Sequence, residues 1–285
     1  MATLNTLDKK IFEDLGKPIV VASHPRSGTH LTIDLLRKQF IECQSWKKRG
    51  EPLDRLYFAL ESFAPKNNPL PESLALNILA RAKRPIIKTH ADPNFSYLLD
   101  QKKNWIDWLH QTADIYYVYR DGRSVLCSLH LFMQSYDPSA RCSFSEFIRQ
   151  EVDGCSRAKN WANHIKAWIN QPNITALCFE DIIHDTELTI QKIREISKLS
   201  YISKHPLLPL KVSSIWYGRW ARFAKKKSES TAILGYYLNQ KVKRWQESFS
   251  LEDCQFFDRE AGETLINLGY ENSHNWVEQT SIISQ

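Results

Sequence analysis

Short apolar runs alternate with amphipathic stretches from about residue 17 to about residue 199. The runs are rich in β-branched and aromatic residues and end at polar ones, which predicts buried strands. Between them, apolar residues recur every three or four positions, the spacing of a helix that buries one face. Strands that alternate with helices predict an α/β fold, with a central, mostly parallel sheet and helices on both faces. The predicted strands cover residues 18–22, 85–89, 115–119 and 174–179.

Length and composition indicate one globular domain. The chain has 285 residues, of which 42% are hydrophobic, and no internal repeat divides it. We predict a single domain over 1–285, with a helix over 1–16 and a C-terminal tail over 272–285. No apolar run approaches the roughly 20 residues that span a bilayer, and the first ten residues are polar. No membrane partner is therefore expected.

Charge and cysteine usage narrow the function classes. The net charge of +6 suits an anionic ligand, but no nucleic-acid reader motif accompanies the basic residues, so no nucleic-acid partner is expected. The six cysteines are scattered and form no Cys-x-x-Cys pair, so no metal site is expected. Unpaired cysteines without a signal peptide favour a cytoplasmic location. The densest basic cluster is Arg219, Arg222, Lys225, Lys226 and Lys227, followed by Lys241, Lys243 and Arg244.

The loop after the first predicted strand has the features of an anion site. Gly28 lets the backbone approach a ligand, and Ser27 and Thr29 supply hydroxyls at the start of the next helix. Arg26 adds a permanent positive charge with forked donors. The Gly-Lys-Ser/Thr of a Walker loop is absent, which argues against an ordinary ATP- or GTP-hydrolysing domain.

Further polar residues lie at the ends of the later strands. Ser27, His90, Arg120 and Glu180 each come just after a predicted strand. In parallel sheets, ligands bind beyond the carboxyl ends of the strands, so these side chains are expected to converge.

Four segments, in this order and spacing, resemble the sulfotransferases that use 3′-phosphoadenosine 5′-phosphosulfate (PAPS). The resemblance runs from about residue 17 to about residue 199, with a weaker echo over 244–249 and 261–270. It implies a P-loop-like sulfotransferase fold, with PAPS as cosubstrate and 3′,5′-ADP (PAP) as product. The segments are His24–Leu31, Lys88–His90, Tyr119–Ser128 and Phe179–Asp181.

The resemblance also implies roles for particular residues. Arg120 and Ser128 would bind the 3′-phosphate, and His90 would be the general base that takes the acceptor proton. Lys88 and Arg26 would stabilise the transferring sulfuryl group in an in-line displacement without a metal. The first loop would cradle the 5′-phosphosulfate through Arg26, Ser27, Gly28, Thr29 and His30.

The chain departs from the family pattern at three places. Leu31 stands where a tryptophan usually stacks on adenine, and Phe179 stands where a tyrosine usually contacts it. The Arg-Lys-Gly run that clamps the 3′-phosphate is missing. The sequence leaves the oligomeric state open. Candidates to replace the clamp are Arg222, Lys225, Lys226, Lys227, Lys241 and Arg244, and the sequence does not choose among them.

The acceptor is expected to be a small molecule, such as a specialised metabolite, with a hydroxyl or amine to be sulfated. Residues 43–82, 91–112, 133–145 and 200–240 are expected to shape its pocket. Asp92, Asp137 and Glu61 could favour a cationic acceptor. The aromatic candidates for the pocket include Phe58, Phe63, Phe95 and Trp105, although most aromatic residues fill cores.

Two other functions are compatible with the anion loop. One is a P-loop-like kinase acting on a nucleotide or small molecule, which would need Mg²⁺ and ATP. The other is a non-catalytic anion-binding protein of the same fold. Lys88 with His90, and Arg120 with Ser128, favour the sulfotransferase.

Overall fold

A computed structural model describes residues 11–64, 69–98, 102–207 and 244–283. Its centre is a five-stranded sheet in the order β2-β3-β1-β4-β7, and every pairing in it is parallel. The four predicted strands are present, and the short β2 is an addition. The strands are β1 (Ile19–Ser23), β2 (Phe58–Ala59), β3 (Ile86–Thr89), β4 (Asp114–Tyr119) and β7 (Ile174–Cys178).

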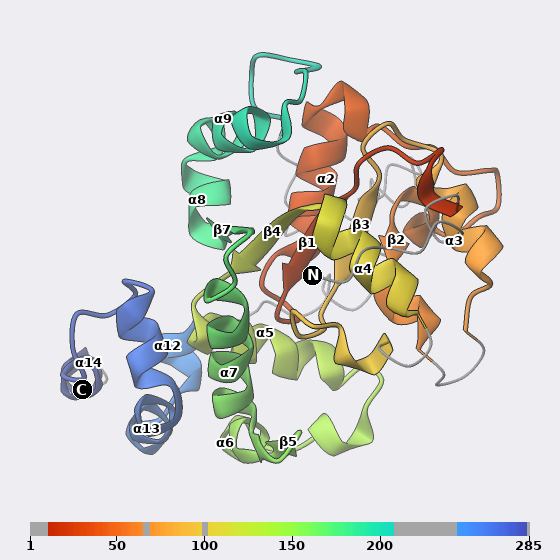
Figure 1. Cartoon of the computed structure of the whole chain (residues 1–285). Helices are drawn as coiled ribbons and strands as arrows, with labels where there is room; N and C mark the ends of the chain where they lie inside the picture. Colours follow the sequence, from red (N-terminus) through yellow and green to blue (C-terminus); the bar gives the residue numbers. More distant parts are fainter. Residues whose placement is uncertain (1–10, 65–68, 99–101, 208–243, 284–285) are drawn as a thin grey trace.

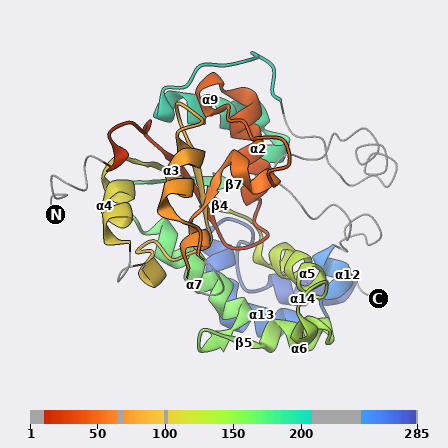
Figure 2. The same cartoon turned by 90° about the vertical axis from the view of Figure 1, so that its right-hand side faces the viewer.

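Helices cover both faces of the sheet, as Figures 1 and 2 show. The side chains of β1 alternate between two apolar cores, with Val20 in one and Val21 in the other. The first core packs against α3 (Glu72–Leu79), α4 (Lys103–Thr112), α5 (Gly122–Met133), α7 (Arg157–Ile169) and α13 (Leu251–Asn267). The second packs against α2 (Thr29–Gln39), α8 (Phe179–His184) and α9 (Thr186–Ser197).

The strand order brings three polar strand ends together. β1 lies between β3 and β4, with Ala22 paired to Thr89 and Ser23 paired to Val118. The residues that follow these strands therefore emerge side by side at the carboxyl edge of the sheet.

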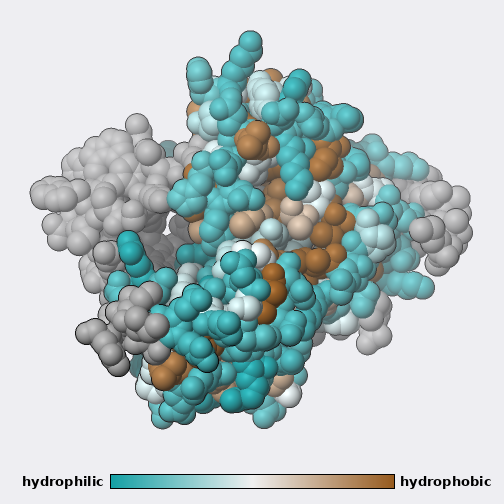
Figure 3. All heavy atoms as spheres, turned by 90° about the vertical axis from the view of Figure 1, so that its left-hand side faces the viewer, coloured by the Kyte–Doolittle hydropathy of each residue, from teal (hydrophilic) through white to brown (hydrophobic). Residues whose placement is uncertain are grey.

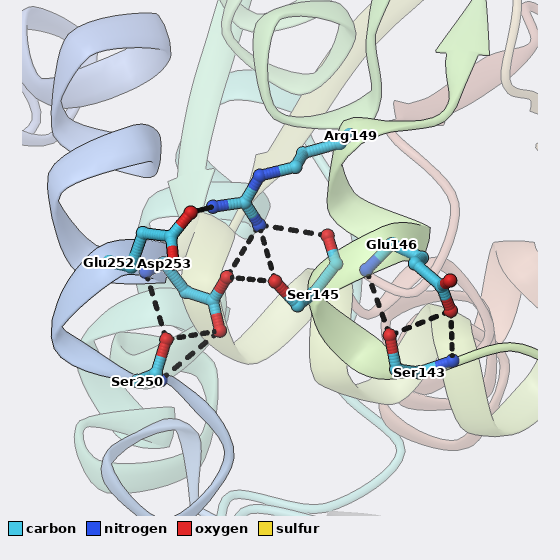
Figure 4. A network of polar contacts seen from close by, with 7 residues as sticks. All are labelled: Ser143, Ser145, Glu146, Arg149, Ser250, Glu252 and Asp253. Atoms are coloured by element: carbon cyan, nitrogen blue, oxygen red, sulfur yellow. Dashed lines mark hydrogen bonds and ion pairs between the residues drawn. The ribbon is translucent and has the colours of Figure 1, made fainter.

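Residues 144–170 form the two predicted helices, α6 (Phe144–Arg149) and α7, joined by a hairpin of β5 (Glu151–Val152) and β6 (Cys155–Ser156). A polar network fastens α6 to α13 (Figure 4). Arg149 donates to Asp253 at 2.5 Å, and Ser145 donates to the same carboxylate at 2.7 Å. Ser250 caps α13 through Asp253, and Ser143 caps α6 through Glu146.

A second contact ties the start of α5 to the C-terminal helices α12 (Trp245–Ser248) and α14 (Trp276–Ile283). The Arg123 guanidinium pairs with Asp121 at 2.8 Å and with Glu271 at 2.5 Å. It also lies 4.0 Å from the ring centre of Trp245 and 4.7 Å from that of Trp276. The Asp121 carboxylate therefore forms its ion pair with Arg123 and not with the neighbouring Arg120.

The sequence predicted a separate segment at each end of the chain. The predicted helix over 1–16 lies mostly outside the described residues, and the predicted tail over 272–285 includes α14, whose Trp276 and Val277 are buried.

No described helix has the length and apolar character to cross a bilayer. All six cysteines lie in the described part of the chain, and their thiols are unpaired. Hydrophilic side chains predominate on the face shown in Figure 3, with apolar ones between them in small groups.

Candidate active site

A cavity of about 1190 Å³ lies at the carboxyl edge of the sheet. Its walls come from the ends of β1, β3, β4 and β7 and from parts of α5 and α7. Ser27 and Ser128 are buried next to this lining rather than on it. The predicted site residues that line the cavity are Arg26, Gly28, Thr29, His30, Lys88, His90, Arg120 and Phe179.

The first loop is shaped by a glycine whose backbone conformation other residues rarely adopt. Gly28 has a φ of 110°, and a Cβ there would lie 2.4 Å from the Phe179 ring. This glycine lets α2 begin directly beneath the ring. At the same turn, the Ser23 and Thr29 hydroxyls are 2.5 Å apart. Ser27 is 1% exposed, and its hydroxyl oxygen has no hydrogen-bond partner among the described residues. A buried hydroxyl of this kind is suited to an anion bound at the helix start.

The first loop is in direct contact with α5 and with Arg120, the residue that follows β4. Arg26 Nε donates to Ser128 Oγ at 3.2 Å, and Arg120 Nη1 donates to the Arg26 carbonyl at 3.4 Å. The Arg120 guanidinium lies 4.3 Å from the centre of the Phe179 ring. Within the described chain, Arg120 forms no ion pair and its buried Nε has no hydrogen-bond partner. Burial lowers the pKa of Arg120, and the Glu180 charge opposes that shift.

His90 is held in one tautomer. Its Nδ1 lies 2.7 Å from the Ser23 carbonyl oxygen. Because a carbonyl oxygen only accepts, Nδ1 carries the proton and Nε2 keeps its lone pair. Burial, reinforced by the Lys88 charge, lowers the pKa of His90 well below 6.5. The imidazole is therefore neutral at physiological pH and able to take a proton.

Glu61 positions the segment that carries Lys88 and His90. Its carboxylate accepts from the Thr89 hydroxyl at 2.9 Å and from the His90 backbone N–H. Burial lowers the pKa of Lys88, while the Glu61 charge opposes that shift. Lys88 lies in the cavity wall together with His90.

The structure adds a second wall that the sequence did not indicate. His24 lines the cavity, and its Nδ1 donates to the Pro25 carbonyl at 3.0 Å. His164, from α7, accepts from the Tyr117 hydroxyl at 2.8 Å and donates to the His90 carbonyl at 3.1 Å. Because His24 directly precedes the anion loop, the sequence offered a signal that it lies at the site. His164 follows no strand, and only packing brings it to the site.

Several expectations about the acceptor pocket were wrong. Phe58, Phe63, Phe95 and Trp105 are fully buried in the core, because each packs on the sheet or on another ring. The predicted segments 91–112 and 133–145 do reach the cavity, through residues such as Asp92, Tyr97 and Tyr136. Residues between 152 and 167, absent from the predicted segments, line it as well. Among the proposed clamp residues, Arg244 is exposed and does not line the cavity. The others, Arg222, Lys225, Lys226, Lys227 and Lys241, lie outside the described residues.

A family model described as the sulfotransferase domain matches residues 17–269. The chain belongs to the sulfotransferase family. The resemblance stated from the four segments is thereby confirmed, and so is the P-loop-like α/β fold.

Two relatives illustrate the match. A 3-alpha-hydroxysteroid sulfotransferase of the guinea pig, Cavia porcellus, is 24% identical to this sulfotransferase over 161 residues. That match covers 52% of this chain and 54% of the relative, so the chain matches about half the length of that protein. The crystal structure of mouse sulfotransferase SULT7A1 complexed with PAP has a TM-score of 0.52 at 16% identity. It covers 98% of this chain and 96% of the mouse chain, and it supports the fold.

Proposed function

We propose that this sulfotransferase transfers a sulfuryl group from PAPS to a hydroxyl or amine of a small-molecule acceptor and releases PAP. The observation that carries the proposal is the hydrogen bond from Arg26 to Ser128 at 3.2 Å. It joins the two segments predicted to bind anions at the edge of one cavity, which His90 lines. A cytoplasmic location and a specialised metabolite as acceptor remain predictions from the sequence.

The residues suit a nucleotide that carries anions at both ends. Arg26, Ser27, Gly28, Thr29 and His30 would hold the 5′-phosphosulfate, since the buried Ser27 hydroxyl has no hydrogen-bond partner among the described residues and α2 begins at Thr29.

The second anionic group would lie at the start of α5. Arg120 and Ser128 would hold the 3′-phosphate, and the open donor at Arg120 Nε supports this. Phe179 and Leu31 both line the cavity and offer apolar surface for the adenine ring.

The chemistry follows from the neutral imidazole. The acceptor oxygen or nitrogen attacks sulfur, the bond from sulfur to the phosphate oxygen breaks, and PAP leaves with that electron pair. His90 Nε2 takes the acceptor proton as the new bond forms. Lys88 and Arg26 stabilise the negative charge on the sulfuryl and leaving oxygens, so the proposal assigns no role to a metal.

Nucleotide preference tests the proposal. PAP at about 100 times its dissociation constant should stabilise the protein by about 2.7 kcal/mol, because it binds only the folded state. Thermal unfolding would be followed with PAP, and in parallel with ATP plus Mg²⁺ as the comparison that a kinase predicts. Stabilisation by ATP and Mg²⁺ without any by PAP would contradict the sulfotransferase function. PAP binding without sulfation of any acceptor would favour the non-catalytic alternative.

The Arg120→Ala variant should bind PAP about 10- to 100-fold more weakly, because a charged donor to a buried phosphate is lost. Isothermal titration calorimetry with PAP measures this, and Arg120→Lys is the matched control because it keeps the positive charge. We expect Arg120→Lys to recover part of the affinity. Equal affinity in wild type and Arg120→Ala would remove this residue from the 3′-phosphate site.

A further inference from the structure

The start of α7 brings to the cavity a guanidinium that the proposed reaction does not use. Arg157 is the first residue of α7 and lines the cavity. Its Nε donates to the Gln150 side-chain oxygen at 3.2 Å, and its guanidinium lies 4.4 Å from the centre of the Phe147 ring. These two contacts fix the plane of the guanidinium and still leave its terminal nitrogens available.

No carboxylate of the described chain lies within ion-pair distance of Arg157. Asp137 contributes to its electrostatics, but that carboxylate accepts from the Ser139 backbone at 2.9 Å and from the Ser139 hydroxyl at 2.7 Å. The terminal nitrogens of Arg157 likewise have no hydrogen-bond partner among the residues that the structure describes. A guanidinium that is held in position without an ion-pair partner among the described residues is suited to bind an oxyanion.

Arg157 lines the cavity together with His24 and His164. Its charge lowers the pKa of His24, which precedes the anion loop and is near His164 in the same wall. The same cavity is lined by the apolar side chains of Phe132 and Met133 from α5. The lining therefore combines apolar surface with the Arg157 cation.

The carboxylates expected to attract a cationic acceptor are engaged elsewhere. Asp92 accepts from the Asn94 backbone at 2.9 Å and also from the Ser96 hydroxyl. Glu61 holds Thr89 and His90, as described above. Asp92 also lines the cavity, but its carboxylate accepts hydrogen bonds from its own segment, whereas the terminal nitrogens of Arg157 have no partner among the described residues.

We propose that the acceptor is an anionic hydroxy compound whose carboxylate or sulfate pairs with Arg157. Its hydroxyl would face His90, and its apolar body would lie against Phe132 and Met133. This inference rests on the proposed function, because it names the substrate class of the same site.

The test compares matched acids and neutral esters. The probes are 4-hydroxyphenylacetate, 3-(4-hydroxyphenyl)propionate, their methyl esters, and 4-hydroxyphenyl sulfate as the sulfate analogue. Binding to the PAP-saturated protein is measured by calorimetry, and kcat/KM is measured with labelled PAPS. Wild type should favour at least one oxyanion over its neutral counterpart by about 10-fold or more, because a charge-assisted pair is formed.

Variants assign this preference to one residue. Arg157→Gln should remove the preference and leave ester turnover and PAP affinity unchanged, whereas Arg157→Lys should retain part of it. Lys166→Gln is the matched control, because it removes the same charge from an exposed position on α7. Unchanged PAP affinity in Arg157→Gln confirms that the variant is folded.

The two measurements separate this inference from the proposed function. An oxyanion preference in binding that depends on Arg157, without turnover of any probe, would support the anionic ligand and count against sulfuryl transfer. Equal binding or equal turnover of acids and esters would overturn the inference and leave the transfer reaction intact. Preference for the acids that persists in Arg157→Gln would overturn it too.

Discussion

The His90→Ala variant should lose about 100- to 10,000-fold in kcat, the range that general-base catalysis contributes. The reason is the fixed tautomer: Nδ1 donates to the Ser23 carbonyl at 2.7 Å, so the Nε2 lone pair is the one available to the acceptor. Burial keeps the pKa of His90 well below 6.5, so most of the enzyme carries the neutral base at physiological pH. Single-turnover sulfation with labelled PAPS measures the loss in the chemical step.

Two readouts distinguish a base from a structural residue. PAP affinity should change little in His90→Ala, because the residues proposed to hold the two phosphates of PAP lie on the first loop, at Arg120 and on α5. Added imidazole should restore part of the activity, since the space left by the side chain opens to the cavity. His184→Ala, at an exposed position, serves as the control variant. Turnover within a few-fold of wild type in His90→Ala would rule out this imidazole as the base.

The buried imidazoles should make the protein lose stability as the pH falls below 6.5. Burial lowers the pKa of His24 from 6.5 to about 3, and it does the same for His30. Below pH 6.5 the unfolded chain binds protons that the folded chain excludes, so the free energy of unfolding falls with pH. The stabilising contribution is complete above 6.5 and is lost progressively as the pH falls toward about 3. For His24 alone, the loss between about pH 7.5 and pH 5 should be about 2 kcal/mol.

Comparison of variants isolates this effect from the titration of carboxylates. Urea unfolding at several pH values would be measured for wild type, His24→Asn and His184→Asn. The decrease in unfolding free energy with falling pH should be smaller by about 2 kcal/mol in His24→Asn, because one buried imidazole is absent. His184→Asn removes an exposed imidazole and should follow the wild-type curve. If the unfolding free energy of His24→Asn depended on pH as in wild type, then His24 would take up a proton equally well in the folded and the unfolded protein.

Much of the fold was predictable because it depends on local patterns. Apolar runs that end at polar residues marked four of the five strands of the sheet, and helical spacing marked α6 and α7 within 144–170. β2 was missed because Phe58–Ala59 is too short to show a periodic pattern. Whether an aromatic residue fills the core or lines the cavity depends on which face of the sheet meets which helix. Phe63 and Trp105 accordingly lie in the core.

The site was predicted where its residues follow strands. Of the four residues expected to converge, His90 and Arg120 line the cavity, as expected from parallel strands that share one carboxyl edge. Ser27 is buried beside the lining, and Glu180 accepts from the Tyr270 hydroxyl and does not line the cavity. Arg157 and His164 were missed because they lie on a helix whose sequence shows only its buried apolar face. Their position depends on the packing of α7 against β4, β7 and α13.

The sequence alone determined the alternation of strands and helices, the anion loop with its glycine, and the chemistry placed at each strand end. These features depend on residues that are neighbours along the chain. Only the tertiary structure decided that β1 lies between β3 and β4, that Arg26 bonds Ser128 across 102 positions, and that Ser23 fixes the His90 tautomer. Such contacts join segments far apart in sequence, and they form only when burial of both faces of the sheet brings those segments together.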